Sequence, residues 1–275
     1  ILADDESTEK ALLHAALRLA GKVGYPGLDL RQHRPLSCLA GEEPKAAENL
    51  PHPFRLSTRT DKVRVLLALP SSPDELMASF KSKLRSQIRR PTKEGMKTCM
   101  GGKELLEAFY QVFSVNMRDL GSPVHDRLLF HSILDTFPDS ARIALVRSRD
   151  REPLAAALVI GFGEVMSNPW ASFLRSRSRA SPNMLLYWSM LAYACDQGYT
   201  AFDFGRSSVN EGTHRFKAQW GGQDVPLCWY GMAPGKMRDG VPESGFLGRA
   251  SQIWKRLPVG VANWIGPKVR GHIGL

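Results

Sequence analysis

The stretch ARIALVRSRDREPLAAALVIGFGEVMSNPWASF, residues 141–173, decides the fold of this chain. Apolar runs fill most of it, and turn residues near Asp150 and Gly163 separate them. Short apolar runs joined by tight turns predict consecutive strands of an antiparallel meander. The three predicted strands are 141–146, 153–162 and 165–173.

Helices and strands alternate around this meander. The helix predicted directly after it, at about 182–197, is apolar almost all round, which is typical of a helix buried against a sheet. The order of elements is typical of a GNAT-type acyltransferase domain, an α+β fold whose mixed, mostly antiparallel sheet is flanked by helices. The remaining elements of this part are helices at about 102–120, 126–136 and 212–219 and strands at 200–204 and 225–230.

The N-terminal part reads as a remnant of a similar arrangement. Four predicted segments divide the whole chain, and the first of them is expected to be an incomplete second GNAT-like domain. The elements predicted before residue 72 are a helix at 7–20, strands at 28–32 and 63–69, and a loop at 41–61. The four segments are a partial GNAT-like domain (1–72), a basic connecting helix (73–100), a C-terminal acyltransferase domain (101–232) and a basic, Trp-containing tail (233–275).

One helix predicted at about 74–90 carries two stripes of different chemistry. Its apolar positions recur every four residues and predict a buried face, and basic positions recur one residue further on. We expect Pro91 to end this helix. The basic stripe suits an anionic acceptor such as a lipid pyrophosphate, and a solvated helix face is an equally weighted alternative. The apolar positions are Leu76, Phe80, Leu84 and Ile88, and the basic ones are Lys81, Arg85 and Arg89.

Composition limits the class of protein and of partner. The chain has 275 residues, 43% hydrophobic and 23% charged, which fits a globular protein and excludes a disordered one. The formal net charge of +10 favours anionic partners such as nucleotides, phosphosugars, RNA or an anionic membrane surface. The four cysteines are widely spaced, and no His/Asp/Glu cluster has metal-ligand spacing, so neither a disulfide framework nor a metal site is predicted. No apolar run reaches the roughly 20 residues of a membrane-spanning helix, and the cytoplasm is the expected compartment.

Four stretches in order along the chain resemble the FemAB-like proteins, specifically the branch associated with exosortase (PEP-CTERM) gene clusters, with its BioF2-like acyltransferase domain. The last stretch is followed by Arg215-Phe216-Lys217 and Gln219-Trp220-Gly221. Together these stretches span more than half of the chain, so the resemblance is specific. The four are KLRSQIRRPTKEG (83–95), NMRDLGSP (116–123), SPNMLLYW (181–188) and FDFGRSS (202–208).

The resemblance implies two GNAT-like domains and an acyltransferase of envelope assembly. Classical Fem transferases move an amino acid from aminoacyl-tRNA to the amine of a peptidoglycan precursor, and the exosortase-associated relatives act in exopolysaccharide assembly. The expected partners are therefore a lipid- or nucleotide-linked anionic precursor and, as donor, acyl-coenzyme A or aminoacyl-tRNA. The expected location is the cytoplasm, at the inner face of the membrane.

Acyl transfer from an activated donor needs positioning, deprotonation of the amine and stabilisation of an oxyanion, rather than a nucleophile triad or a metal. Lys217 matches the Phe-Lys pair of the family and is the first candidate, with Phe216 beside the donor. Without the resemblance, a solvated lysine on a short amphipathic helix would be the favoured alternative. Arg206 follows a strand end and suits a phosphate or carboxylate. An ion pair with Asp203 or Glu211 is the alternative for Arg206. Asp203 is the candidate general base, or else orients Arg206.

The remaining candidates concern the donor and the acceptor cleft. Ser181 and Asn183 open the buried helix, whose N-terminus is where a GNAT domain receives the coenzyme A pyrophosphate. The usual glycine-rich loop is missing, and Arg177 in the preceding loop is an alternative ligand for phosphate or RNA backbone, with a plain solvated loop as an equally weighted alternative. Trp170 is a candidate for lining the acceptor cleft, although a strand Trp more often packs in the core.

The tail mixes Trp254 and Trp264 with Lys and Arg residues, a composition that fits an anionic membrane surface. A tail docked on the domain is the favoured alternative, because Pro258 and Pro267 break any long helix. Two other functions stay open beside aminoacyl transfer: a plain N-acetyltransferase that uses acetyl-coenzyme A, and a catalytically silent RNA- or membrane-binding protein that keeps the fold.

Overall fold

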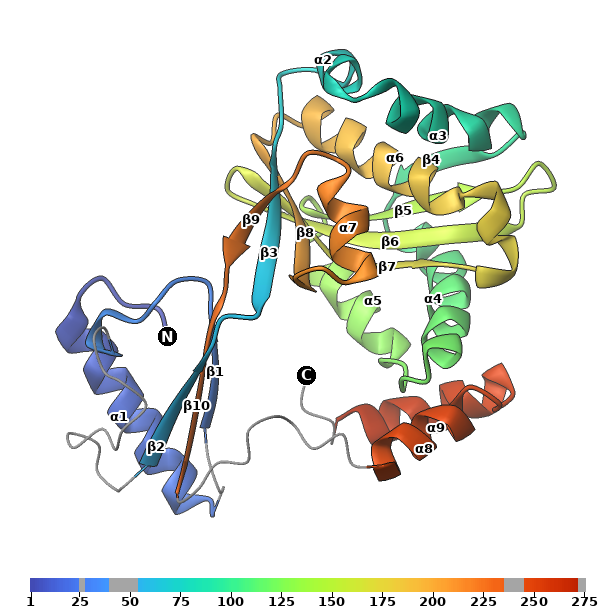
Figure 1. Ribbon diagram of the computed structural model, residues 1–275. Helices are drawn as coiled ribbons and strands as arrows, with labels where there is room; N and C mark the ends of the chain where they lie inside the picture. The colour runs from blue at the N-terminus through green and yellow to red at the C-terminus, as the bar shows by residue number, and fades with distance from the viewer. Residues whose placement is uncertain (25–27, 40–53, 235–244, 272–275) are drawn as a thin grey trace. The chain divides into compact units, whose positions relative to one another are not determined.

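The computed structural model describes residues 1–24, 28–39, 54–234 and 245–271 (Figure 1). The chain forms two compact units that are discontinuous along the sequence, whereas the four predicted segments are continuous. The small unit contains Ile1–Val65, Arg206–Phe216 and Gln223–Pro242. The large unit contains Leu66–Gly205, Lys217–Gly222 and Glu243–Leu275.

The predicted meander is present, with bounds within a residue of those read from the sequence, and the helices before and after it are present as well. It forms the centre of a seven-stranded sheet with the order β4-β5-β6-β7-β8-β3-β9. β7 and β8 pair in parallel, while β4 through β7 pair antiparallel. The strands are β3 (Lys62–Ala68), β4 (Lys97–Gly101), β5 (Ala141–Arg147), β6 (Pro153–Phe162), β7 (Val165–Phe173), β8 (Ala201–Ser208) and β9 (Gln223–Pro226).

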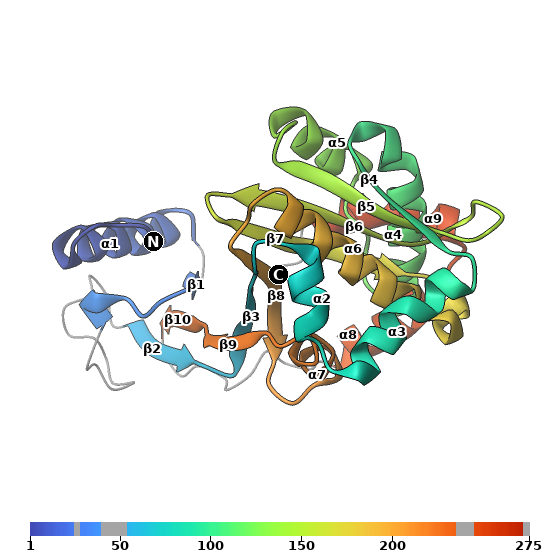
Figure 2. The same ribbon diagram turned by 90° about the horizontal axis from the view of Figure 1, so that it is seen from above.

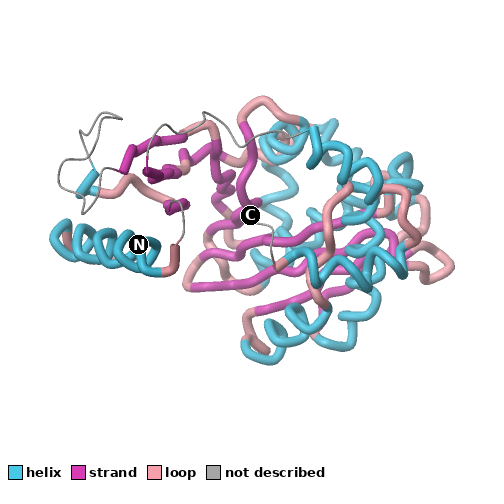
Figure 3. Tube along the Cα trace, turned by 90° about the horizontal axis from the view of Figure 1, so that it is seen from below, coloured by secondary structure: helices cyan, strands magenta, loops and turns pink. Residues whose placement is uncertain are grey.

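Helices cover both faces of the sheet in the large unit (Figures 1, 2 and 3). On one face α6 (Pro182–Asp196) lies under α2 (Pro73–Ser79) and α3 (Ser82–Lys93), and on the other lie α4 (Leu106–Leu120) and α5 (Arg127–Thr136). The core beneath α4 and α5 is aromatic: Phe130 packs edge-on against Phe109 and Phe113. Two further helices of this unit, α8 (Gly245–Trp254) and α9 (Val259–Arg270), pack on α4.

The small unit is built on a three-stranded antiparallel sheet of order β1-β10-β2. Its helix α1 begins after the capping side chain of Asp5 and contributes the buried Leu13 and Leu17 to the core. Glu9 on the same helix is also buried, and its carboxylate accepts from the backbone N–H groups of Ser37 and Cys38, which offsets the cost of its burial. The elements are α1 (Glu6–Lys22), β1 (Leu28–Gln32), β2 (Phe54–Arg59) and β10 (Cys228–Pro234), with α7 (Gly212–Ala218) connecting the two units.

The single helix predicted over 74–90 is wrong: the chain is extended at Phe80 and Lys81, where α2 ends and α3 begins. The break is held by Arg85, whose guanidinium donates to the carbonyl of Phe80 at 2.6 Å and to that of Ala78 at 3.3 Å. At the break, the Phe80 ring packs edge-on against the rings of Trp188 and Trp220. Consequently Lys81 does not share a helix with Arg85 and Arg89, although the four apolar positions are all buried.

Other differences from the sequence expectations concern prolines and strands. Pro91 lies inside α3, near its end, where only one late hydrogen bond is lost, and Pro267 lies inside α9. Residues 54–59 of the predicted loop form β2, while residues 40–53 lie outside the described part. The strand predicted at 225–230 is split between β9 and β10, and the edge strand β4 was not foreseen.

Candidate active site

The centre of the candidate site is the middle of β8. Asp203 is buried, as are its neighbours along the strand, Phe202 and Phe204. Its carboxylate accepts from the backbone N–H of Gly205 at 2.8 Å. Gly205 has φ +75°, a left-handed conformation that glycine adopts without strain. The buried Asp203 carboxylate thus fixes a backbone turn within β8. The turn comes directly after Asp203, the last residue of β8 for which pairing with β7 is described.

Lys217, on α7, points at this turn. Its side chain is only 8% exposed, and its ammonium donates to the carbonyl of Gly205 at 3.1 Å. A buried ammonium is costly unless it is hydrogen-bonded, so this carbonyl fixes the position of the charge. Lys217 and Asp203 are therefore brought to the same residue, Gly205.

Asn168 on β7 belongs to the same place. It is 6% exposed, and its backbone carbonyl lies beside Gly205. Its side-chain oxygen has no hydrogen-bond partner among the described residues. Because buried polar atoms are nearly always paired, this acceptor marks a position where a ligand donor would be satisfied. Sequence reasoning missed it, although a polar residue within an apolar strand run is a visible signal.

Aromatic rings line the side of the site toward α6. Tyr187 stacks on Phe204 at 5.8 Å between ring centroids and on Trp220 at 6.1 Å. Phe80, from the break between α2 and α3, meets Trp220 edge-on at 5.6 Å. Burial raises the pKa of Tyr187 to about 12, and a hydrogen bond donated by the amide nitrogen of Asn168 opposes this shift, so the phenol stays protonated at neutral pH.

A groove of about 580 Å³ opens in the large unit, and the residue after Lys217, Ala218, lines it, whereas Lys217 itself is not among its lining residues. Its lining combines leucine and aromatic side chains with two lysines and two glutamines. Such a lining suits a ligand with an apolar acyl part and an anionic part. The lining residues are Leu67, Ser79, Phe80, Lys81, Lys83, Leu84, Gln87, Ala218, Gln219, Trp220 and Gly221.

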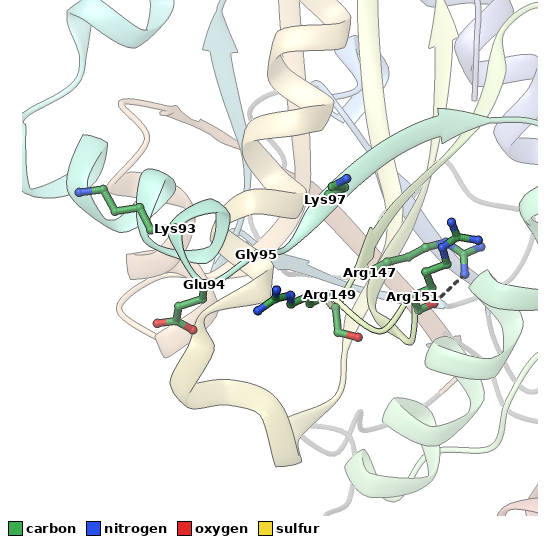
Figure 4. Close-up of a pocket in the computed structure, with 8 residues that line it drawn as sticks. Lys93, Glu94, Gly95, Lys97, Arg147, Arg149 and Arg151 are labelled. Carbon is green, nitrogen blue, oxygen red and sulfur yellow. Dashed lines mark hydrogen bonds between the residues drawn. The ribbon is translucent and has the colours of Figure 1, made fainter.

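A second, basic hollow of about 910 Å³ lies at the other end of α3, shown in Figure 4. Arg147 and Arg151 stand side by side in it, with Arg149 between them and Lys93 (Figure 4). Of its lining side chains only Glu94 forms an ion pair within the described residues, with Arg90 outside the hollow. Its lining consists of Lys93, Glu94, Gly95, Lys97, Arg147, Ser148, Arg149 and Arg151.

Arg206 and Phe216 belong to the small unit, in contrast to Lys217 and Asp203. Arg206 is exposed, and its guanidinium lies over the ring of Trp229 at 5.5 Å from the centroid. Phe216 is half-buried. The sequence places Arg206 after a strand end, whereas it lies inside β8; its predicted role toward a phosphate or carboxylate stays a prediction.

The other predicted residues are spread over the large unit. Ser181 and Asn183 lie at the start of α6, where Ser181 has φ +54° and makes no side-chain cap. Arg177 forms an exposed ion pair with Glu152 at 3.4 Å. Trp170 packs edge-on against Phe130 in the core and is not among the groove residues. Of the basic stripe, Arg85 holds the break before α3 and Arg89 is exposed on the helix.

Comparison with known families gives a match to the family described as "Acetyltransferase (GNAT) domain". The match runs over residues 78–218, which is 141 of the 275 residues, just over half of the chain. It includes α6, β8 and α7, and so Asp203, Gly205 and Lys217. No curated protein matches the sequence.

Several solved structures share the fold. FemX is 17% identical with a TM-score of 0.58, over 82% of this chain and 77% of that one. A C-terminal domain (DUF2156) from an Agrobacterium fabrum protein is 14% identical with a TM-score of 0.59, over 85% and 75%. L-PGS from Bacillus licheniformis is 14% identical with a TM-score of 0.56, over 88% and 76%. At these identities the likeness shows the fold, and it confirms the predicted α+β GNAT-like architecture.

Proposed function

The chain belongs to the GNAT acetyltransferase domain family, and from this premise we propose that it transfers an acyl or aminoacyl group to an amine of a cell-envelope precursor. The precursor is a peptidoglycan or exopolysaccharide intermediate. The proposal that the acceptor is a cell-envelope precursor is supported by the sequence resemblance to the exosortase-associated FemAB-like branch and by the shared fold with FemX. The general activity, acyl transfer, follows from the family; the acceptor is our proposal.

The observation that carries the proposal is the buried ammonium of Lys217, which is held on the Gly205 carbonyl and adjoins in sequence the groove residues Ala218 to Gly221. A cation fixed in a poorly solvated site stabilises negative charge that develops there far better than one in water. We assign Lys217 to the oxyanion of the tetrahedral intermediate or to the phosphate nearest the reacting carbonyl. The side-chain oxygen of Asn168 is assigned to accept from the incoming amine.

The chemical step is aminolysis of an activated acyl group. The amine nitrogen forms a bond to the acyl carbon, and the bond from that carbon to the thioester sulfur or ribose oxygen breaks. Asp203 is the proposed acceptor for the proton that the amine loses, and the departing thiolate or alkoxide takes up a proton in turn. No oxidant or further reactant is needed.

Two donors fit different parts of the large unit. The start of α6, with Ser181 and Asn183, is the proposed site for the pyrophosphate of acyl-coenzyme A, because free backbone N–H groups of a first turn bind anions. The basic hollow of Figure 4 suits the phosphodiester backbone of an aminoacyl-tRNA. Exposed Arg177 lies just before α6 and serves either donor.

The family match favours a second candidate function, N-acetylation with acetyl-coenzyme A. One assay distinguishes acetyl-coenzyme A from aminoacyl-tRNA as the donor. The protein is incubated with a nucleotide-linked peptidoglycan precursor and either radiolabelled acetyl-coenzyme A or a labelled mixture of aminoacyl-tRNAs. Label on the precursor amine from aminoacyl-tRNA supports the first function, and label only from acetyl-coenzyme A supports the second. Absence of transfer from both, with RNA binding retained, would favour a catalytically silent RNA-binding protein.

The proposed function also implies peripheral contact with a membrane surface, because late envelope precursors are lipid-linked. No helix in the described part is long and apolar enough to cross a bilayer. Residues 245–270 contain five Lys and Arg residues and neither Asp nor Glu. On α9, Val261, Trp264 and Lys268 are exposed and follow helical spacing, and the ammonium of Lys268 lies 4.3 Å from the centroid of the Trp264 ring.

The helices α8 and α9 are nevertheless docked on the large unit, as the alternative reading expected. Arg118 of α4 donates to the carbonyl of Leu257 at 3.0 Å, and Gly266 lies directly against Val124. Docking and an exposed basic, apolar face are therefore compatible. We propose that this face rests on anionic phospholipid. Trp264→Glu is expected to abolish sedimentation with phosphatidylglycerol vesicles, whereas Phe162→Glu, at an exposed aromatic of the β6–β7 turn, is expected to leave it unchanged.

A further inference from the structure

The groove at the break between α2 and α3 has four buried apolar side chains in its lining. Those of Leu67, Phe80, Leu84 and Trp220 are each at most 8% exposed. They come from β3, from the break, from α3 and from the segment after α7, and all belong to the large unit. A hollow of about 580 Å³ with such side chains is within the size range of sites for small organic ligands.

The exposed part of the same lining is positively charged. Lys81 and Lys83 are both exposed, and neither forms an ion pair or a side-chain hydrogen bond within the described residues. The lining contains neither Asp nor Glu. Two amides, those of Gln87 and Gln219, add hydrogen-bond donors. The lining therefore carries two positive charges that no carboxylate in the described part of the chain neutralises.

The backbone at the break favours an anion as well. Arg85 donates to the carbonyls of Phe80 and Ala78, at 2.6 Å and 3.3 Å, and so occupies acceptor groups at the end of α2. α3 begins directly after the break, without a side-chain cap at Lys81 and without an acidic residue in its first turn. Since the start of a helix carries partial positive charge, the backbone adds to the attraction that the two lysines exert.

We propose that this groove binds a fatty acid, with its carboxylate at Lys81 and Lys83 and its hydrocarbon chain on the buried apolar side chains. Ammonium groups are point charges, and two of them suit the two oxygens of a carboxylate. Phosphate groups favour the planar fork of arginine, and the lining contains no arginine. Each methylene that the groove buries contributes about fourfold in affinity.

This inference goes beyond the proposed function, because binding of a fatty acid requires neither the donor nor the acceptor of the transfer. The groove is nevertheless linked to the candidate catalytic lysine. The backbone N–H of Trp220 donates to the carbonyl of Lys217 at 3.1 Å, and the Trp220 ring stacks on Tyr187. A fatty acid in the groove would therefore contact a residue that is hydrogen-bonded to Lys217.

Calorimetric titration of the full chain with decanoate tests the groove, and decyltrimethylammonium and decyl phosphate present the same chain with other head groups. We expect decanoate to bind, and the cationic amphiphile to bind at least about tenfold more weakly. Lys81→Gln combined with Lys83→Gln should weaken decanoate about tenfold, since an exposed ion pair contributes about threefold. Arg89→Gln removes an exposed charge of α3 outside the lining and is the matched control, with unchanged affinity expected.

A second variant tests the apolar part and guards against misfolding. Ala218→Trp places a large ring in the lining from an exposed position and keeps both lysines. It should weaken decanoate at least about tenfold and leave the thermal midpoint close to that of the wild type. Octanoate should bind the wild type about tenfold more weakly than decanoate, because two fewer methylenes are buried.

Four results would overturn the proposal. Decanoate could fail to bind the wild type, or Ala218→Trp could leave its affinity unchanged, which would place the ligand elsewhere. Equal weakening by Arg89→Gln and by the double lysine variant would mean nonspecific attraction to a basic protein. Tighter binding of decyl phosphate than of decanoate would assign the groove to a phosphate-headed ligand. Because neither acyl donor nor acceptor is present, a failed titration leaves acyl transfer standing, and a failed transfer assay leaves the fatty acid site standing.

Discussion

Two cationic sites of the large unit are built in opposite ways. One ammonium, that of Lys217, is buried and fixed on the carbonyl of Gly205. The ammoniums of Lys81 and Lys83 are exposed and line the groove at the break between α2 and α3. One site has a single charge in a poorly solvated place, and the other has two charges in contact with water.

This difference separates chemistry from recognition. A buried charge acts strongly over a short distance and is suited to charge that develops only in the transition state. Exposed charges are screened individually, but as a group they attract an anion that is already charged when it arrives. The account therefore assigns turnover to the surroundings of Lys217 and the binding of a fatty acid to the groove.

The largest predicted effect that separates the sites is that of Asp203→Asn. Asparagine can still accept from the Gly205 N–H, but it is not a base, so kcat should fall about 100-fold while KM changes little. Steady-state transfer assays measure both constants. Asp150→Asn, in the exposed β5–β6 turn, is the control and should be unaffected. A wild-type kcat in Asp203→Asn would remove this residue as the base.

The next effect is expected at the groove and in affinity. Lys81→Gln combined with Lys83→Gln should weaken decanoate about tenfold, because two exposed ammoniums no longer attract the carboxylate. Added salt should weaken decanoate binding by the wild type more steeply than by this variant, since exposed charges are screened. Titrations at low and at high salt measure both effects. Equal salt dependence of the two proteins would show that the lysines do not face the bound anion.

A smaller loss is expected from Gly205→Ala. A Cβ there would meet only the Asn168 carbonyl at 3.6 Å, an ordinary contact, so the cost is the left-handed backbone, about 1 kcal/mol of unfolding free energy. Because the strain shifts the carbonyl that holds Lys217, kcat should fall several-fold. Gly163→Ala imposes similar strain in an open hairpin turn at φ +54° and should lower stability without changing kcat.

The smallest effect concerns alkaline stability. The folded chain holds the Tyr187 proton up to a pKa of about 12, whereas an unfolded tyrosine loses it near 10, so the free energy of unfolding should fall between these values as pH rises. Tyr187→Phe should flatten this fall in urea titrations from pH 9 to pH 11. An unchanged slope would mean that the phenol is not buried with its proton.

The sequence predicted regular elements well and their interruptions poorly. The meander strands and α6 follow from local periodicity, which short-range patterns preserve. The break at Phe80 could not be predicted in the same way, because it depends on Arg85 and on the contact of Phe80 with Trp220, distant in the chain. The stripe of Leu76, Leu84 and Ile88 is equally compatible with one helix or two.

The candidate sites show the same division. Lys217, Asp203 and Arg206 are candidates from the sequence whose roles stay predictions, and the structure brings the first two to Gly205. The groove was missed because Lys83 and Trp220 are far apart in the chain, and only the packing of α3 near the segment after α7 brings them into one lining. Contacts between distant segments leave no local signal in a single sequence.

The central claim, that the buried ammonium of Lys217 accelerates the transfer step itself, is tested by a single-turnover measurement. Enzyme loaded with labelled donor is mixed with saturating precursor, and the transfer rate is compared between the wild type and Lys217→Met, which preserves the length and apolar part of the side chain. The account predicts a rate at least about 100-fold lower with donor affinity and thermal midpoint close to the wild type. A transfer rate equal to that of the wild type would contradict it.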